Sequence, residues 1–237
     1  MAIKPSYPDP NSRRVVLKAI FFDLDETLIT RAAAIRAFIA DQYQRYRAQL
    51  GNVTEAAFAN RFLDIEDNGR IGKHLVYPAL VKALGITGVS PETLLEDYRK
   101  IYPGFAITNP GALETLKALR QASFKVGILT NGNEVVQNGK IDVIGIRPLL
   151  DAIVISEAVG LKKPDPAIFR LAAEKIGEAP EACLFVGDNP EVDVVGAAGV
   201  KMQTAWFRNG EAWPEGLTPR ADIDIDKLAE VLPYCGL

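Results

Sequence analysis

Short apolar runs, each followed by polar turn residues, occur near the start of the chain and again through its second half. The run at residues 15–22 is β-branched at its start and interrupted only by Lys18, which is typical of a buried parallel strand. Further strands are expected at 124–129, 152–155, 182–186, 203–207 and 223–225. From residue 111 onward helices separate the strands, and this order predicts a parallel sheet covered on both faces.

Between residues 31 and 108 the apolar positions recur at helical spacing and no strand is expected. Helices are predicted at 32–50, 54–65, 74–84 and 91–101. Successive helices without a strand indicate a separate bundle inserted into the sheet domain. The sequence therefore predicts an α/β protein with these parts: a loose tail at 1–14, a Rossmann-like parallel sheet core at 15–30 and 109–237, and an α-helical insert at 31–108.

Two carboxylates stand at the end of the first predicted strand. Asp23 and Asp25 would open into the crevice where open α/β sheets bind ligands. A carboxylate attacks phosphorus when a metal ion neutralises the incoming dianion, and a second carboxylate can move a proton. By itself the pair is equally compatible with turn or N-cap aspartates. Further groups are needed to decide between these interpretations.

The later strands supply such groups. Thr130, Asn131 and Gly132 place a hydroxyl and a glycine-relieved turn before a helix, which favours anion binding. Lys163 precedes a proline that biases it toward an extended conformation, so it can direct a positive charge, although Lys162 beside it competes for this role.

Two more carboxylates, Asp188 and Asp193, follow the strand at 182–186. There they could join Asp23 around a hard, oxygen-preferring metal ion such as Mg2+. Asp193 could instead act through water or favour a helix start.

These segments, in this order, resemble the four motifs of the haloacid dehalogenase superfamily, and the resemblance covers residues 15–232. It implies an aspartyl-phosphate phosphatase fold that uses Mg2+, with a mobile helical cap at 31–108. The resemblance implies that Asp23 is the nucleophile, Asp25 the general acid/base and Lys163 the charge clamp. The implied phosphate-binding residues are Thr130, Asn131 and Gly132, and the implied metal ligands are Asp23, Asp25, Asp188 and Asp193.

Asp25 favours phosphate esters over organohalides, because the leaving oxygen of an ester needs a proton whereas a halide does not. The expected function is Mg2+-dependent hydrolysis of a small soluble phosphate monoester, a sugar phosphate or a nucleoside monophosphate. A sugar phosphomutase and a non-enzymatic phosphoacceptor domain remain alternatives. Cap residues considered for substrate selection are Tyr43, Arg47, Asn68 and Arg70, whereas Arg208 and Asn209 are the less favoured choice.

Composition limits the partners and the cellular location that the sequence is compatible with. The net charge of −3 and the lack of lysine or arginine blocks argue against nucleic acid as a partner. Cys183 and Cys235 fit free thiols in a reducing compartment. The start lacks the pattern of a secretory signal and no apolar stretch is long enough to span a bilayer, so no membrane partner and a cytoplasmic location are expected. Glu26 is expected to face solvent, and the oligomeric state is left open.

Overall fold

A computed structural model describes residues 16–237, and the predicted tail at 1–14 lies outside the described residues. Its centre is a six-stranded, wholly parallel sheet in the order β3-β2-β1-β4-β5-β6. The strands are β1 Ala19–Phe22, β2 Lys125–Thr130, β3 Ala152–Ile155, β4 Cys183–Gly187, β5 Gln203–Phe207 and β6 Ile223–Ile225. The prediction of a Rossmann-like parallel core is confirmed.

Strand β1 is shorter than the run at 15–22 predicts. Its pairing in register with both neighbours begins at Ala19, which lies opposite Lys125 on one side and Cys183 on the other. Val16 precedes this point and is 74% exposed. The apolar Val16 and Leu17 therefore precede the paired part of the strand.

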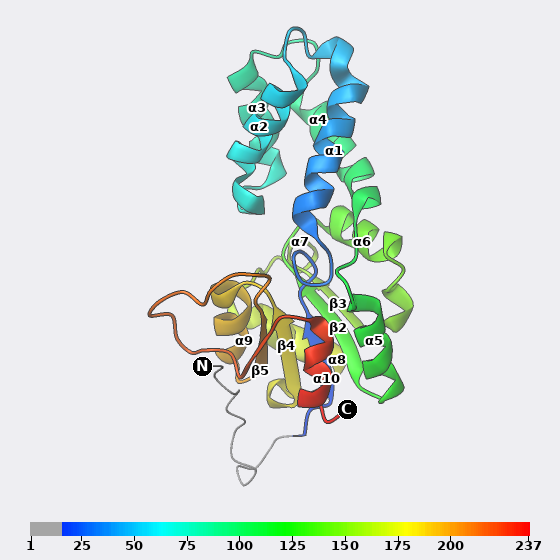
Figure 1. Ribbon diagram of the computed structural model, residues 1–237, viewed down its shortest axis with the longest axis vertical. Coiled ribbons are helices and arrows are strands. Elements are labelled where there is room, and N and C mark those ends of the chain that lie inside the picture. Colours follow the sequence, from blue (N-terminus) through cyan, green and yellow to red (C-terminus); the bar gives the residue numbers. More distant parts are fainter. Residues whose placement is uncertain (1–15) are drawn as a thin grey trace.

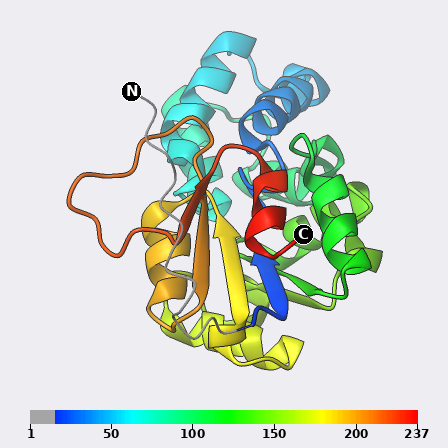
Figure 2. The same cartoon turned by 60° about the horizontal axis from the view of Figure 1, so that its bottom comes forward.

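Two layers of helices cover the faces of the sheet (Figure 2), and alternate residues of β1 belong to the apolar clusters on its two sides. Ile20 and Phe22 belong to an apolar cluster with helices α5 and α10, whereas Ala19 and Phe21 pack with helices α8 and α9. This two-sided burial explains the continuous apolar run in the sequence. The core helices are α5 Ala112–Gln121, α6 Glu134–Val143, α7 Ser156–Val159, α8 Pro166–Ile176, α9 Gly196–Ala198 and α10 Val231–Tyr234.

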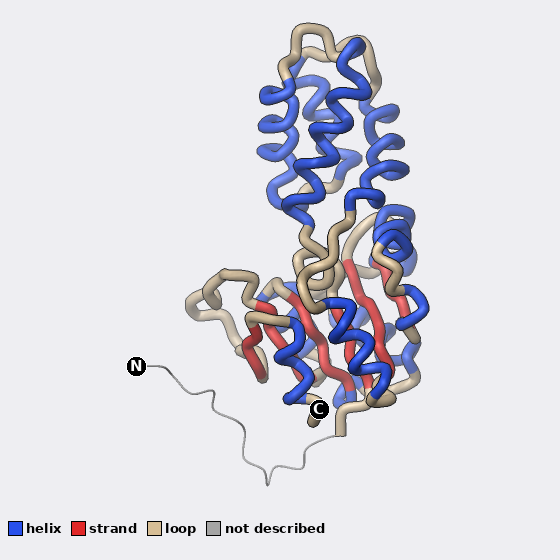
Figure 3. The backbone as a smooth tube through the Cα atoms, turned by 45° about the vertical axis from the view of Figure 1, so that its right-hand side comes forward, coloured by secondary structure: helices blue, strands red, loops and turns tan. Residues whose placement is uncertain are grey.

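The helical insert stands above the carboxyl ends of the strands and has its own apolar core (Figures 1 and 3). Phe38, Phe62 and Tyr77 are among its fully buried side chains. Its helices are α1 Arg31–Tyr46, α2 Glu55–Glu66, α3 Lys73–Leu84 and α4 Pro91–Ile101. The insertion of a helical layer after β1 agrees with the prediction, although the first helix gives way to a 3-10 turn after Tyr46. Movement of the insert as a cap stays a prediction.

The two ends of the insert leave the core side by side. Ile29 forms an antiparallel bridge with Thr108, and the Thr30 amide donates to the Ile107 carbonyl at 2.9 Å. The Asn109 side chain donates to the Thr27 carbonyl at 2.8 Å. A short two-stranded base therefore joins the insert to the loop that follows β1.

In the part of the chain that the structure covers, no helix combines the length and the apolar character needed to cross a membrane.

Candidate active site

The loops after β1, β2 and β4 meet at one edge of the sheet because these strands pair in parallel register. Phe22 lies opposite Ile128 and Val186, and the Asp23 amide continues the ladder by donating to the Val186 carbonyl at 2.9 Å. The predicted site residues of these loops are thus brought together beneath the insert, as the carboxyl ends of parallel strands require.

Lys163 connects two of the predicted carboxylates. Its Nζ lies 2.8 Å from Asp23 Oδ1 and 2.6 Å from Asp193 Oδ1, and its side chain is 2% exposed. Burial lowers the pKa of the lysine, but the charges of Asp193 and Asp23 outweigh it and hold the pKa above its usual value. The ammonium group is therefore a fixed positive charge between the two loops.

Asn131 holds this lysine from the neighbouring loop. Its Oδ1 accepts from the Lys163 amide at 2.9 Å, and its Nδ2 donates to the Lys163 carbonyl at 3.0 Å. Both polar groups of the side chain are thereby engaged by the backbone of Lys163, whose bond to Pro164 is cis. In this structure the Asn131 side chain serves to place the lysine, and its predicted contact with substrate stays a prediction.

Asp23, Asp188 and Asp193 form a compact acidic group. Each offers a carboxylate oxygen, and these oxygens lie within 4.8 Å of one another. Burial, followed by repulsion from Asp193, raises the pKa of Asp188 to about 8. Burial also raises the pKa of Asp23 to about 6, despite the opposing charge of Lys163. The single ammonium group does not compensate the three carboxylates, which is an arrangement suited to a divalent cation.

Small groups around Asp193 and Asp188 fix their directions. Asp193 Oδ2 accepts from the Asn189 amide at 3.0 Å, and a Cβ at Gly187 would fall 2.4 Å from that same oxygen. Asp188 Oδ1 accepts from the Thr27 hydroxyl at 3.1 Å. Only a glycine before Asp188 leaves room for the Asp193 carboxylate.

Asp25 differs from this group in its surroundings. Both of its carboxylate oxygens accept from Lys140 Nζ, at 2.8 and 3.0 Å, and Oδ2 also accepts from Gln137 Nε2 at 2.9 Å. Burial alone would raise the pKa of Asp25, but the ion pair with Lys140 holds it below its usual range. The carboxylate lies outside the acidic group around Asp23, so its predicted metal contact stays a prediction.

Thr130 ends β2 with a buried hydroxyl. Its Oγ1 accepts from Gln137 Nε2 at 2.8 Å, so one amide group contacts both Thr130 and Asp25. Gly132 has a φ of 152°, and a Cβ there would lie 2.9 Å from Gln137 Cγ. The glycine therefore permits both the turn and the close packing of Gln137.

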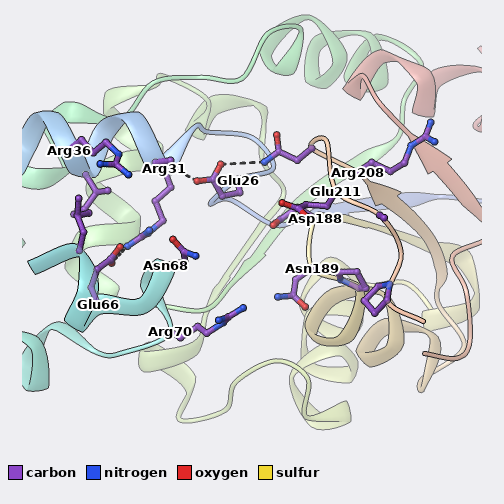
Figure 4. A pocket seen from close by; sticks show the side chains of 17 residues that line it. Glu26, Arg31, Arg36, Glu66, Asn68, Arg70, Asp188, Asn189, Arg208 and Glu211 are labelled. Carbon is purple, nitrogen blue, oxygen red and sulfur yellow. Dashed lines mark hydrogen bonds and ion pairs between the residues drawn. The ribbon is translucent and has the colours of Figure 1, made fainter. Parts of the chain in front are cut away.

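A cavity of about 620 Å³ lies between the insert and the core loops and includes Asp188 in its wall (Figure 4). In Figure 4, Arg31, Glu66, Asn68 and Arg70 approach it from the insert, opposite Asp188 and the core loops. Arg31 and Glu66 form an ion pair within this wall. The volume is in the range of small-molecule binding sites.

Glu26 contacts this cavity and does not simply face solvent, which corrects the prediction. Its Oε1 accepts from the Ala32 amide at 2.8 Å in the first turn of α1, where a negative charge is favourable. Its Oε2 accepts from Asn209 Nδ2 at 3.4 Å. A side chain from the β1 loop thus contacts both sides of the cavity.

The residues considered for substrate selection fall into two groups. Asn68 and Arg70 line the cavity, and so do the less favoured Arg208 and Asn209. Tyr43 is buried in the insert, where its hydroxyl donates to the Val53 carbonyl at 2.9 Å. Arg47 is exposed in the 3-10 turn after α1 and does not line the cavity.

The sequence prediction missed Gln137, Lys140 and Thr27. Gln137 and Lys140 are one helical turn apart in α6, on the side that also buries Val136 and Ile141. A lysine and a glutamine among buried apolar positions of a helix are unusual, and this was the available signal.

The sequence and fold together assign the chain to a family. The model of the haloacid dehalogenase-like hydrolase family matches residues 17–201, and the chain belongs to this family. The fold agrees, since the structure of a haloacid dehalogenase phosphatase from Thermococcus onnurineus superimposes with a TM-score of 0.71 at 29% identity, covering 93% of this chain and 98% of that one.

Among curated relatives, a glyceraldehyde 3-phosphate phosphatase of Methanopyrus kandleri is 32% identical over 89% of this chain and 91% of its own length. The pyrimidine 5'-nucleotidase YjjG of Escherichia coli is 29% identical, covering 84% of this chain and 90% of that protein. The prediction of a hydrolase with phosphatase activity is therefore confirmed.

Proposed function

We propose that this phosphatase hydrolyses a small soluble phosphate monoester through an aspartyl-phosphate on Asp23, with Mg2+ as cofactor. The observation that carries the proposal is the position of the Lys163 ammonium between Asp23 and Asp193, beside the third carboxylate Asp188. The proposal is supported because a carboxylate able to attack phosphorus, a positive charge and an oxygen-rich group suited to a cation lie around one point.

The acidic group fits the cofactor. Asp23, Asp188 and Asp193 offer only oxygen ligands, as Mg2+ prefers. Burial raises the pKa values of Asp23 and Asp188, and repulsion from Asp193 raises both further. Bound there, the ion would neutralise charge on the phosphoryl oxygens and on the attacking carboxylate.

The chain's own residues supply the remaining steps. A carboxylate oxygen of Asp23 attacks phosphorus, the ester P–O bond breaks, and Asp25 gives a proton to the leaving oxygen. Asp25 then takes a proton from water, which attacks phosphorus and displaces Asp23 to release inorganic phosphate. Despite burial, the ion pair with Lys140 lowers the pKa of Asp25, whereas the negative charge of an approaching phosphate dianion would raise it, because like charges repel.

The leaving group would occupy the cavity of about 620 Å³, whose walls include Asn68 and Arg70. These polar walls favour a polar leaving group such as a sugar or a nucleoside, and the relatives that act on glyceraldehyde 3-phosphate and pyrimidine nucleotides support a metabolite of this size. A cytoplasmic location is consistent with such a substrate.

The test is phosphate release from a panel of sugar phosphates and nucleoside monophosphates, with Mg2+ and with a chelator. Repeated, Mg2+-dependent release from a member of the panel is expected. Transfer of the phosphoryl group within a sugar without net release would favour the phosphomutase alternative, and release limited to one equivalent per chain would favour a phosphoacceptor.

A further inference from the structure

Two polar side chains of α6 are buried beside Asp25, and the proposed reaction gives them no role. Gln137 is 2% exposed and Lys140 is 3% exposed. Removing an ammonium group from water is costly unless it is paired and hydrogen-bonded. The contacts of Lys140 therefore indicate what the helix is built to hold.

Lys140 is saturated by contacts around Asp25. Its Nζ donates to both Asp25 oxygens, at 2.8 and 3.0 Å, and to Gln137 Oε1 at 2.9 Å. The same atom lies 4.9 Å from the centre of the Tyr102 ring, in a cation–π contact at the base of the insert. The lysine thus fixes Asp25 from the side of α6.

Gln137 extends this arrangement to the phosphate-binding loop. Its Nε2 lies 2.9 Å from Asp25 Oδ2 and 2.8 Å from Thr130 Oγ1. Because residues three apart share a helix face, Gln137 and Lys140 approach Asp25 together. The missing side chain at Gly132 leaves the space that Gln137 fills.

We propose that Lys140 and Gln137 are positioning residues that fix the Asp25 carboxylate for proton transfer, and that Gln137 couples its direction to the Thr130 hydroxyl. The proposal rests on the proposed function, in which Asp25 is the acid/base. Asp25 lies in a turn, whereas the two donors belong to a helix that starts directly beyond the Thr130 loop. A donor pair on a rigid element removes rotational freedom from the carboxylate before the substrate arrives.

The leaving-group dependence of the reaction separates positioning from a purely structural role. An alkyl phosphate needs a proton from Asp25 as its P–O bond breaks, whereas nitrophenyl phosphate needs little protonation. In Lys140→Met, kcat/KM for an alkyl phosphate is expected to fall about 10- to 100-fold, with a loss of only a few-fold for nitrophenyl phosphate. Gln137→Leu, which keeps Lys140, is expected to lower kcat/KM for the alkyl phosphate relative to nitrophenyl phosphate in the same way.

Lys125→Met is the matched control. Lys125 opens β2 at the opposite end of the sheet and pairs with Glu178, so its loss removes the same charge without contact with Asp25. In Lys125→Met, the ratio of kcat/KM for the alkyl phosphate to kcat/KM for nitrophenyl phosphate is expected to equal that of the parent. Thermal unfolding of each variant shows that the compared proteins are folded at the assay temperature.

A double-mutant cycle completes the test, because the effects of mutating two residues are not additive when one residue acts through the other. In Asp25→Ala/Lys140→Met, which leaves no unpaired carboxylate at residue 25, the substrate ratio should equal that of Asp25→Ala alone. Equal losses for both substrates in Lys140→Met, or a further change of ratio in the Asp25→Ala background, would overturn the positioning proposal alone. An unchanged ratio in Asp25→Ala would overturn the acid/base role, and the positioning proposal with it.

Discussion

The carboxylate of Asp193 occupies the space beside Gly187, with its Oδ2 only 2.4 Å from the position that a Cβ at residue 187 would take. The same carboxylate accepts from Lys163 at 2.6 Å. The absence of one methyl group in β4 therefore determines where the positive charge of the site can lie.

Gly187→Ala is expected to displace Asp193 and, through it, Lys163, because a contact of this length must be relieved by movement. Phosphatase activity should fall by about 10-fold or more. Gly104→Ala is the control, since a Cβ at residue 104 meets nothing within 4 Å. Full activity in Gly187→Ala would contradict the tight packing described above.

Asp23→Asn is expected to lower turnover by several orders of magnitude, because an amide cannot attack phosphorus. The measurement is phosphate release from nitrophenyl phosphate, together with acid-quench trapping of the phosphoenzyme. Asp165→Asn is the matched control and should keep parental turnover. Asp165 caps α8 by accepting from the Ala167 amide, and asparagine can cap a helix in the same way. Near-parental turnover in purified Asp23→Asn would show that another residue is the nucleophile.

Lys163→Ala is expected to reduce kcat/KM far more than Lys162→Ala, although both remove one charge. The Lys163 ammonium group is buried between two carboxylates, where water and salt screen it poorly, whereas the Lys162 side chain is exposed to solvent. Kinetics of the two variants at low and high salt provide the comparison. Similar losses in both would argue against the charge-clamp role.

The stability of the metal-free protein should fall as the pH rises from about 5 toward 8, above the range in which carboxylates with lowered pKa values, such as Asp25 and Glu66, act in the opposite direction. The pKa of Asp188 is raised to about 8 and that of Asp23 to about 6, so the folded state binds more protons than the unfolded state in this window. Asp188→Asn, which can still accept from Thr27, should raise the Tm at pH 8 by about 3 °C or more.

Added Mg2+ should raise the Tm of the parent at pH 8 and have much less effect on Asp188→Asn. Thermal unfolding across this pH range, with and without Mg2+, measures both effects. A Tm of the metal-free parent that rises with pH over this window would contradict the charge arrangement.

Arg70→Ala is expected to raise KM for the preferred metabolite about 10-fold while leaving nitrophenyl phosphate nearly unaffected. Arg70 lines the cavity from the insert, opposite Asp188, where the proposed function places the leaving group of the substrate (Figure 4). Arg47→Ala removes the same charge from an insert residue outside the cavity. Equal effects of the two variants on the substrate panel would remove Arg70 from the specificity site.

The sheet and the meeting of Asp23, Asp188 and Asp193 could be predicted because these residues come after buried strands whose carboxyl ends parallel pairing brings together. Lys163 comes after β3 and the short helix α7, and the proline after it was the signal for its role. The residue at which β1 begins could not be predicted, because apolar residues just before the sheet resemble those within it. Tyr43 was a candidate for the cavity because helical periodicity does not tell which buried neighbour a helix face meets.

The contacts of Asp25 required the structure for a different reason. Its partners Lys140 and Gln137 are more than 100 residues away along the chain, at separations of 115 and 112 residues. No spacing rule connects a turn after β1 with the buried face of α6. The polar pair in that helix was visible in the sequence, but its partner was not.

The bridge between Ile29 and Thr108 brings together the two points where the chain enters and leaves the helical insert, and the insert also packs against α6 through Val136. Because entry and exit lie side by side, a bundle of different length or shape would need to match this junction and the face of α6 that packs against the insert. Strand register on either side would be unaffected by such an exchange. The fold thus allows the insert to be exchanged as one module while Asp23, Lys163 and Asp193 keep their positions in the core.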